Sequence, residues 1–450
     1  MHRRTWGTTL AAAAVIGGGW WGVGRLEARE RVAAARVARA AASSDVELRT
    51  QDIAFYEQRA ARDPMSAGDR ARLAALYLQR ARETTDPEDY ARAERAARAS
   101  LGLRTMRNGA AFVTLASSLL AQHRFAEARA VARQLVGGEP RNDAYRALLG
   151  ESCLELGDYA CARTAFDSIS QPGRGALAVA PRLARWAEIR GDGARARYLV
   201  RRARAVADSL PGLPREQVAW FHLRAGDLEL RQGRPARAEQ EFRAGLAVIP
   251  GDHRLLAALA RLALVRHEWR DAIALGDSAI AVVLDPATLG VVADAYAALG
   301  DTAKAAEYAR TMEVAASGEP GAYHRAWSLY LLDHDTRTAE VLAAAQAEIA
   351  TRRDVYGYDL LAWALYKRGR VAEARAASDA ALAQGTQDAL LLYHAGMIAQ
   401  AAGEPARAHR FLERALAVNA HFDHAHPARA RLVLDSLARA PRHAARRPRV

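Results

Sequence analysis

The sequence predicts an all-α fold, a solenoid built from about ten helical hairpins. Three observations predict it. Turn residues recur about every 34 positions. An alanine stands five positions after each turn, and a small residue stands seven positions before nearly every turn. The composition of 51% hydrophobic and 26% charged residues over 450 positions is typical of a folded globular chain, long enough for several domains or for one continuous array.

The period is set by residues that we assign to turns between paired helices. Successive turns are separated by 34, 34, 42, 34, 33, 34, 35 and 34 residues, and the turn residues are His123, Gly157, Gly191, Gly233, His267, Gly300, His334, Gly369 and Gly403. Glycine readily takes the left-handed conformation that ends a helix, and histidine is among the few other residues that do so. We therefore expect the three histidines to act in turns rather than to bind a metal.

The residues that flank the turns have a fixed register. Five positions after every turn stands an alanine: 128, 162, 196, 238, 272, 305, 339, 374 and 408. Seven positions before each turn stands a small residue, at 116, 150, 184, 226, 260, 293, 362 and 396, and the exception is Trp327. Two antiparallel helices approach to about 8–9 Å only where small side chains face each other, so this register predicts the closest contact within each hairpin.

This spacing resembles the tetratricopeptide repeat (TPR) consensus over about residues 52–437. The best copies read Gly226, Ala238, Phe242, Pro250 and Gly150, Ala162, Phe166, and Ala128 is followed by Pro140 at the family's offset. An irregular hairpin from Ala67 to Leu101 precedes the first turn, and Glu229 and Trp327 depart from the pattern. The sequence resembles bacterial TPR proteins, and this resemblance implies a right-handed α-solenoid. It also implies that the protein binds a protein or peptide in its concave groove, without catalysis or a cofactor.

The register divides the array. Residues 52–208 form an N-terminal sub-array and residues 217–425 a C-terminal one. Between them, at 209–216, two prolines and a glycine lengthen one interval to 42 residues and predict a soft boundary. Leucines 432, 434 and 437 predict a capping helix over 426–438, because the open end of a solenoid must be covered. A basic tail over 439–450 is expected to be disordered.

The N-terminus carries an export signature. Within residues 1–24, Arg3 and Arg4 precede an apolar, glycine-rich run that ends near Trp20 and Trp21. Three interpretations of this segment remain: an uncleaved membrane anchor, a cleaved signal peptide or a buried N-terminal helix. If the segment is an anchor, residues 25–51 are expected to form a juxtamembrane helical linker. The expected location is the cell envelope, either anchored in the inner membrane with periplasmic repeats or secreted to the periplasm. No particular oligomeric state is predicted.

Family register nominates groove residues. In TPR proteins the groove is lined by the first helix of each repeat, at positions thirteen, ten, six and three before each turn. Aromatic residues there are favourable anchors for a ligand. The C-terminal third is the preferred site, and the alternative is that its rings pack between repeats. The candidates are Tyr356, Asp359, Trp363, Tyr366, Tyr393, Trp220, Asp227, Arg261 and His324.

Other functions compete for the same residues. The net charge of +13 would suit nucleic acid or an anionic surface, but seven arginines against one aspartate lie beyond residue 428. A solvated arginine-rich surface is therefore the better interpretation, and binding of nucleic acid is the alternative. The sequence contains no phosphate-binding glycine loop, no HExxH and no Cys-x-x-Cys. A metal-dependent enzyme would have to use the weak cluster His421, Asp423, His424 and His426.

Two cysteines flank one predicted turn. Cys153 and Cys161 stand four residues before and after Gly157, one on each helix of the same hairpin. Outside the cytoplasm this placement permits a disulfide, and two small buried thiols are the alternative.

Overall fold

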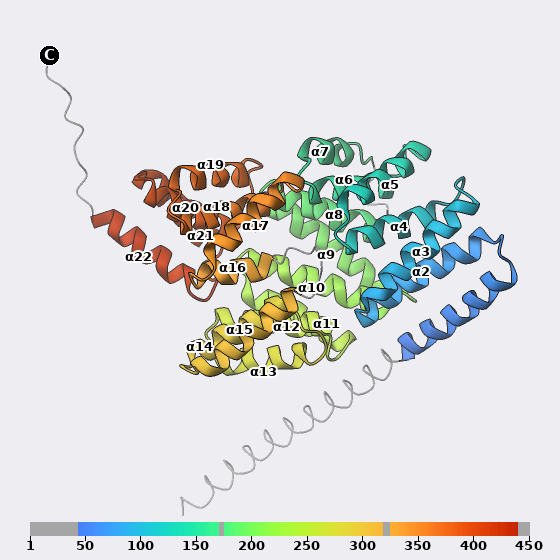
Figure 1. Cartoon of the computed structure of the whole chain (residues 1–450), viewed down its shortest axis with the longest axis horizontal. Helices are drawn as coiled ribbons and strands as arrows, with labels where there is room; N and C mark the ends of the chain where they lie inside the picture. The colour runs from blue at the N-terminus through green and yellow to red at the C-terminus, as the bar shows by residue number, and fades with distance from the viewer. Residues whose placement is uncertain (1–43, 171–174, 318–324, 440–450) are drawn as a thin grey trace, which may run out of the picture.

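The computed structural model describes residues 44–170, 175–317 and 325–439. Within these ranges every regular element is a helix, and no strand is present. Residues 44–62 are helical, and the helices α2 to α21 follow as ten antiparallel hairpins, with α22 after the last (Figure 1). The all-α solenoid of about ten hairpins with a terminal helix is therefore confirmed.

The first helices of the hairpins are α2 (Ala67–Thr84), α4 (Gly109–Ala121), α6 (Asp143–Glu155), α8 (Ala176–Ile189), α10 (Arg215–Arg231), α12 (His253–Val265), α14 (Pro286–Ala298), α16 (Arg325–Asp333), α18 (Val355–Lys367) and α20 (Ala389–Ala401). The second helices are α3 (Pro87–Leu103), α5 (Phe125–Gly138), α7 (Tyr159–Asp167), α9 (Gly193–Ser209), α11 (Pro235–Val248), α13 (Trp269–Ile280), α15 (Thr302–Ser317), α17 (Thr338–Thr351), α19 (Val371–Leu382) and α21 (Pro405–Val418). The terminal helix α22 spans His426–Arg439, close to the predicted 426–438.

The turns adopt the predicted left-handed conformation at eight of the nine positions. The turn glycines have φ between 70° and 82°, and His123 and His267 have φ of 57° and 63°. The turn at His334 differs, because its left-handed residues are Asp335 and Arg337. The role of His123 and His267 as turn residues is thus confirmed, whereas His334 is displaced from that position.

The register also describes how each hairpin packs. Seven of the nine alanines that follow a turn are fully buried, and the exceptions are Ala305 and Ala339 on α15 and α17. A Cβ added to Gly226 would lie 2.3 Å from the ring of Phe242, and one added to Gly150 would lie 2.6 Å from the ring of Phe166. The small residue therefore makes room for the large one sixteen positions later on the partner helix.

Hairpin α16–α17 departs from this packing where the sequence does. Trp327 occupies the position that is small elsewhere, and it stacks on Tyr330 with the ring centroids 6.0 Å apart. Because an indole cannot fit where two helix backbones meet, α16 and α17 pack less closely than the other hairpins. The exposed Ala339 of α17 is the consequence.

The predicted boundary at 209–216 does not interrupt the core. One cluster of buried residues includes Ala203 and Ala207 from α9 together with Phe221 and Ala225 from α10. The prolines and glycine of the insertion end α9 at Ser209 and delay α10 to Arg215, but both helices run to seventeen residues and pack along their length. The insertion is therefore a long connection inside one array rather than a division between two.

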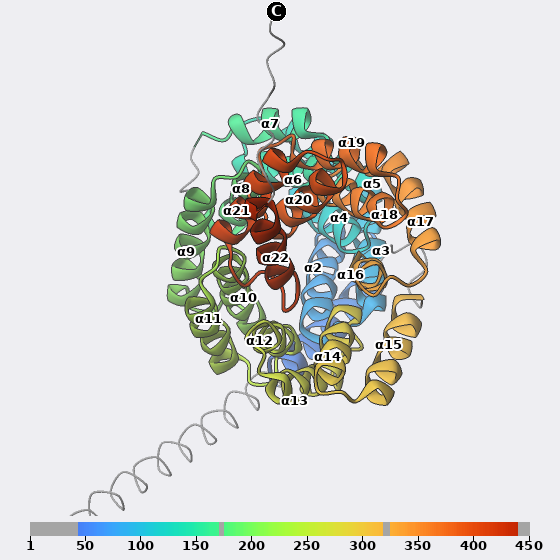
Figure 2. The same ribbon diagram turned by 90° about the vertical axis from the view of Figure 1, so that its left-hand side faces the viewer.

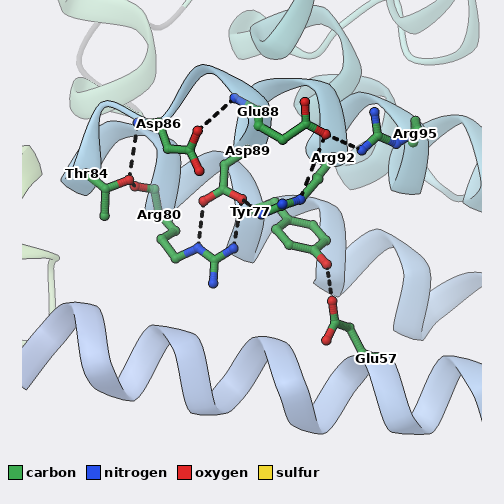
Figure 3. A network of polar contacts seen from close by, with 9 residues as sticks. All are labelled: Glu57, Tyr77, Arg80, Thr84, Asp86, Glu88, Asp89, Arg92 and Arg95. Atoms are coloured by element: carbon green, nitrogen blue, oxygen red, sulfur yellow. Dashed lines mark hydrogen bonds and ion pairs between the residues drawn. The ribbon is translucent and has the colours of Figure 1, made fainter.

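The first hairpin, which lacks the glycine register, contains a polar network instead (Figure 3). The Arg80 guanidinium donates two hydrogen bonds to the carboxylate of Asp89, over 2.6 and 2.8 Å, and so joins α2 to α3. Tyr77 of α2 donates to Glu57 and ties the preceding helix to the same hairpin. Because Asp89 is only 1% exposed, its bidentate partner is needed to offset the cost of burying its charge.

The array curls until its second half, α12 to α21, touches its first half, α2 to α11 (Figure 2). Helices α8, α10, α12 and α14 lie toward the inside of the ring, and α9, α11, α13 and α15 lie outside. The Arg353 amide, before α18, donates to the carbonyl of Leu156, after α6, over 3.2 Å. The Asn419 side chain donates to the carbonyl of Leu230 over 2.9 Å. We call this contact between the two halves the seam.

The seam uses the turns themselves. A Cβ added to Gly157 would lie 2.3 Å from the backbone of Arg353, and one added to Gly191 would lie 2.3 Å from the carbonyl oxygen of Gly385. By contrast, nothing lies within 4 Å of such an atom at Gly300 or Gly369. Glycine at positions 157 and 191 therefore allows a distant segment of the chain to pack closely against the turn, in addition to forming the turn itself.

Candidate functional site

A large cavity lies on the inside of the first six hairpins of the array. Its volume is about 790 Å³, and its walls come mostly from the first helices of six successive hairpins, α2, α4, α6, α8, α10 and α12, with Tyr90 of α3. The wall residues used below are Val113, Ser117, Glu151, Leu154, Glu155, Pro181, Arg182, Arg185, Glu216, Trp220, Phe221, Arg224 and Arg254. We call this space the interior cavity.

Trp220 gives the interior cavity its aromatic surface. Its ring meets Phe221 edge to face with the centroids 5.0 Å apart, and Phe221 is buried whereas Trp220 is half-buried. Leu154 of α6 and Pro181 of α8 contribute apolar surface nearby on the same wall. An indole fixed by a buried neighbour and open on one side is the kind of group that anchors a ligand side chain.

Charged groups line the rest of the interior cavity, mostly as ion pairs. Arg182 lies 2.6 Å from Glu151, and Arg254 lies 2.7 Å from Glu216. Arg185 is different, because no ion pair involves it among the described residues and its guanidinium lies 5.0 Å from the ring centroid of Tyr356. Among the described residues of the wall, Arg185 and the exposed Arg82 are thus cations that no ion pair balances.

The acids near Arg185 are held in a poorly solvated environment. Burial raises the pKa of Glu155 above its usual range, although the charges of Arg185 and Arg352 oppose that shift. Glu188 is shared, because Arg231 lies 2.7 Å and Arg224 3.5 Å from its carboxylate. Positive charge is thus in excess on the wall formed by α8 and α10.

The aromatic groove predicted in the C-terminal third is a packed interface. Trp363 and Tyr393 are each 3% exposed and Asp359 is 2% exposed. Trp363 stacks on His394 at 4.1 Å, and Asp359 accepts hydrogen bonds from His394 and Arg325 over 2.9 and 3.2 Å. The prediction that these three residues face a groove is wrong, because their rings and carboxylate are used between neighbouring hairpins.

The covering element is the start of α22. His426, its first residue, stacks on Tyr393 with the centroids 4.6 Å apart, and Phe422 lies 5.7 Å from the same ring. Tyr366 stacks on Trp363 at 4.8 Å and is half-buried. The terminal helix therefore closes the surface on which the sequence placed a ligand.

The remaining groove candidates lie apart. Tyr356 is half-buried near the seam, between the guanidinium groups of Arg185 and Arg325. Asp227 lies 2.6 Å from Arg261, so these two predicted residues pair with each other. His324 lies outside the described residues. Of the eight candidates that the structure describes, only Trp220 lines the interior cavity.

The arginines of the interior cavity were not predicted from the sequence, although register identifies two of them. Arg185 stands six positions before Gly191 and Arg254 thirteen before His267, and applying the groove count at every turn would have named both. Arg182 and Arg224 each stand nine positions before a turn and have no such signal. Their role depends on the curvature of the whole array.

The cluster near His424 has a structural explanation. Asp423 accepts the backbone N–H groups of Ala425 and His426 over 2.8 and 2.9 Å, at the start of α22. The His421 amide donates to the side chain of Asn419. Among the described residues no group of three or more histidine, cysteine or acidic side chains is arranged to hold a metal ion.

The same junction predicts a pH dependence of stability. Burial would lower the pKa of His426, but contact with Asp333 and the charges of Asp423 and Asp333 outweigh it, so the pKa is raised above its usual value near 6.5. A raised histidine pKa adds stability below about pH 6.5 that is lost as the pH rises through the folded-state value. We expect the unfolding free energy measured in urea titrations to fall as the pH rises from 6 to 8.5.

Replacing His426 with Gln provides the control for this dependence. The Gln variant should show a smaller fall over the same interval, with the remainder coming from His424, whose pKa is also raised by Asp423 in spite of burial. Equal falls in both proteins would exclude His426 as the source.

The two cysteines are joined. The Sγ atoms of Cys153 on α6 and Cys161 on α7 are 2.02 Å apart, and their Cα atoms are 5.8 Å apart. The bond spans the turn at Gly157, whose neighbours Leu156 and Tyr159 accept hydrogen bonds across the seam. The disulfide therefore braces the hairpin against which the second half of the array packs.

No helix in the described part of the chain combines the length and apolar character needed to cross a membrane. The apolar segment within residues 1–24 and the basic tail beyond residue 439 both lie outside the described residues.

Comparison with known proteins gives the following similarities. No curated protein matches the chain. Similar solved structures include a tetratricopeptide repeat protein from Parabacteroides merdae, with 16% identity over 58% of this chain and 99% of that one and a TM-score of 0.35. A human IFIT1 dimer with PPP-AAAA is 14% identical over 78% of this chain and 90% of the IFIT1 chain, with a TM-score of 0.43. A chain of the APC/C hetero-tetramer Cut9-Hcn1 is 12% identical over 88% of this chain and 94% of its own length, with a TM-score of 0.34.

The sequence profile of the tetratricopeptide repeat matches two segments, residues 113–176 and 223–287. The first segment contains the packed pair Gly150 and Phe166, and the second contains Gly226 and Phe242. These two segments are therefore tetratricopeptide repeats, and they carry the register that also organises the other hairpins.

Proposed function

We propose that the protein is a scaffold that binds a segment of a partner protein in the interior cavity. A tetratricopeptide repeat array suggests a role in protein–protein interaction. The observation that carries the proposal is the half-buried Trp220 on a cavity of about 790 Å³ whose walls come from six hairpins. A cavity of that size takes a short extended stretch or one helical turn rather than a folded domain.

The chemistry of the wall describes the segment. An apolar or aromatic side chain would pack on Trp220, and an acidic side chain would compensate Arg185, which has no ion pair among the described residues. The neighbouring pairs Arg182–Glu151 and Arg254–Glu216 already balance their own charge. The proposal includes no catalytic step and no cofactor.

Site-specific photo-cross-linking tests the location of the partner. A photoreactive residue at Ser117, on the wall of the interior cavity, should yield an adduct with a discrete partner, whereas one at the exposed Arg163 on α7 should not. Trp220→Ala should reduce that adduct by at least about tenfold, because a central aromatic anchor contributes about 2 kcal/mol or more. Tyr198→Ala, which removes an exposed ring from the outer helix α9, is the matched control. Equal adducts from positions 117 and 163 would refute the assignment.

We also propose that the array lies in the cell envelope, outside the cytoplasm. The motivation is the sequence of residues 1–24, with two arginines before an apolar run, and the disulfide is compatible with an oxidising compartment. Fractionation of cells that express the chain with and without residues 1–24 tests this. The full chain should be found with membranes or periplasm, and recovery of both forms from the cytosol would contradict it.

Binding of nucleic acid receives less support. Many arginines of the described residues are engaged with acids of the same surface, as in the pairs Arg124–Glu127 and Arg370–Glu373, at 2.7 and 2.6 Å. A polyanion would have to compete with these neighbours for the same guanidinium groups.

A further inference from the structure

A second cavity lies in the seam, apart from the interior cavity. Its volume is about 250 Å³, and it forms where the α8–α9 and α10–α11 turns meet the α19–α20 connection and α21. Its lining includes Glu188, Arg197, Arg231, Gln232, Arg234, Tyr356, Thr386, Gln387, Asp388 and Arg414. We call this space the seam cavity. Both halves of the array are needed to form it.

Two of its four arginines have no acidic partner in the described structure. Among the described residues the side chain of Arg197, on α9, makes no ion pair or hydrogen bond, and Arg414 of α21 donates only to the amide oxygen of Gln387, over 2.6 Å. Arg234 donates to the amide oxygen of Gln232 over 2.7 Å and lies 3.4 Å from Glu229. A neutral amide holds a guanidinium in position without cancelling its charge.

The acids of the seam cavity are already engaged. Asp388 accepts the backbone N–H groups of Leu390 and Leu391 at the start of α20, over 2.9 and 3.4 Å. Glu188 lies 2.7 Å from Arg231, whose Nε is buried and has no hydrogen-bond acceptor among the described residues. Four guanidinium groups thus face two carboxylates that are both in use.

The unbalanced charge of the seam cavity has an energetic cost. Burial and the nearby charge of Arg234 lower the pKa of Arg197 below its usual range, with Glu229 only partly opposing them. A bound anion would remove this repulsion and supply an acceptor to Arg231. It would also connect the two halves of the array, because Arg414 belongs to the second half and the other three arginines to the first.

We propose that the seam cavity binds a phosphate group. Phosphate fits because its several oxygens accept from guanidinium groups that approach from different directions, which a single carboxylate cannot do equally well. The volume admits inorganic phosphate, pyrophosphate or the phosphate of a small ester, and it excludes a large ligand. This site is independent of the partner segment proposed for the interior cavity.

Calorimetric titration of the full chain at low ionic strength tests the proposal, with inorganic phosphate, pyrophosphate and phosphoserine as probes. At least one should bind with one-to-one stoichiometry and a Kd below about 1 mM. Tighter binding of the inorganic anions identifies a free phosphate as the ligand, and tighter binding of phosphoserine identifies a phosphate ester. Failure of all three to bind, or equally tight binding of malonate, would overturn the assignment to phosphate.

Substitutions locate the binding. Arg197→Gln and Arg414→Gln should each weaken it by about tenfold or more, because each removes one charge-assisted contact. Arg195→Gln removes an equal charge from an exposed position on the same helix as Arg197 and should change the Kd less than about twofold. Arg414 is exposed, so its variant will fold even if that of Arg197 does not. Equal weakening by all three substitutions would show that the anion binds to general surface charge.

Discussion

Truncating Phe242 to Ala is expected to lower the stability of hairpin α10–α11 by about 3–5 kcal/mol. Phe242 is fully buried on α11, and its ring fills the space that Gly226 leaves open on α10. Removing the ring loses its burial and leaves a cavity between two helices that already approach closely. Hydrogen exchange of the core amides of α10 and α11 measures the effect. Phe55→Ala, where the ring is 53% exposed, is the matched control and should cost less than about 1 kcal/mol.

The same pair predicts a specific coupling. Gly226→Ala alone should cost about 1–3 kcal/mol, although alanine favours a helix, because its Cβ would lie 2.3 Å from the ring of Phe242. In the Phe242→Ala background the methyl group has space, so the second substitution should cost little. Gly102→Ala, with nothing within 4 Å of the added atom, should be neutral or slightly stabilising. Additive costs of the two substitutions would mean that these residues do not pack on each other.

Replacing Gly157 with Val is expected to open the seam. The residue has φ of +72°, and a Cβ there would lie 2.3 Å from the backbone of Arg353, so the second half of the array must move away. Hydrogen bonds across the seam would then break, each worth about 0.5–1.5 kcal/mol, and one of them joins the Arg352 side chain to the carbonyl of Glu155. The radius of gyration from small-angle scattering should rise.

Gly369→Val separates this effect from local strain. Gly369 has φ of +73° in an equivalent turn, but nothing lies within 4 Å of an added Cβ. A side chain in the left-handed conformation costs both variants about 1–2 kcal/mol, and only Gly157→Val should expand the protein. If the two variants had the same radius of gyration, the seam would not be held closed in solution.

The features predicted from sequence are those fixed by local spacing. Glycine at a turn, alanine five positions later and a small residue seven positions earlier determine one hairpin, and hairpins repeat. The site was harder to predict. Groove positions were assigned by their distance before each turn, and this count does not show which of them the terminal helix α22 covers. Trp363 and Tyr393 occupy those positions, but His426 and Phe422 cover them. That contact depends on where α22 returns, which no periodic pattern encodes.

The seam was not predictable for a related reason. It joins Leu156 to Arg353 and Leu230 to Asn419, residues almost two hundred positions apart. Whether such residues meet depends on small rotations added over every intervening hairpin. Trp327, in a position that is small elsewhere, alters one of these rotations, and the sequence shows the departure without its direction. The arginines of both cavities owe their convergence to the same summed curvature.

Hydrogen exchange at two amides tests most directly whether the array closes on itself. The N–H of Arg353 donates to the carbonyl of Leu156, and the N–H of Val355 donates to the hydroxyl of Tyr159 over 2.7 Å. Both precede or begin α18, where an amide has no acceptor within its own helix. The closed array predicts that both are protected in the wild type and in Gly369→Val and exchange freely in Gly157→Val. Free exchange of both amides in the wild type would contradict it.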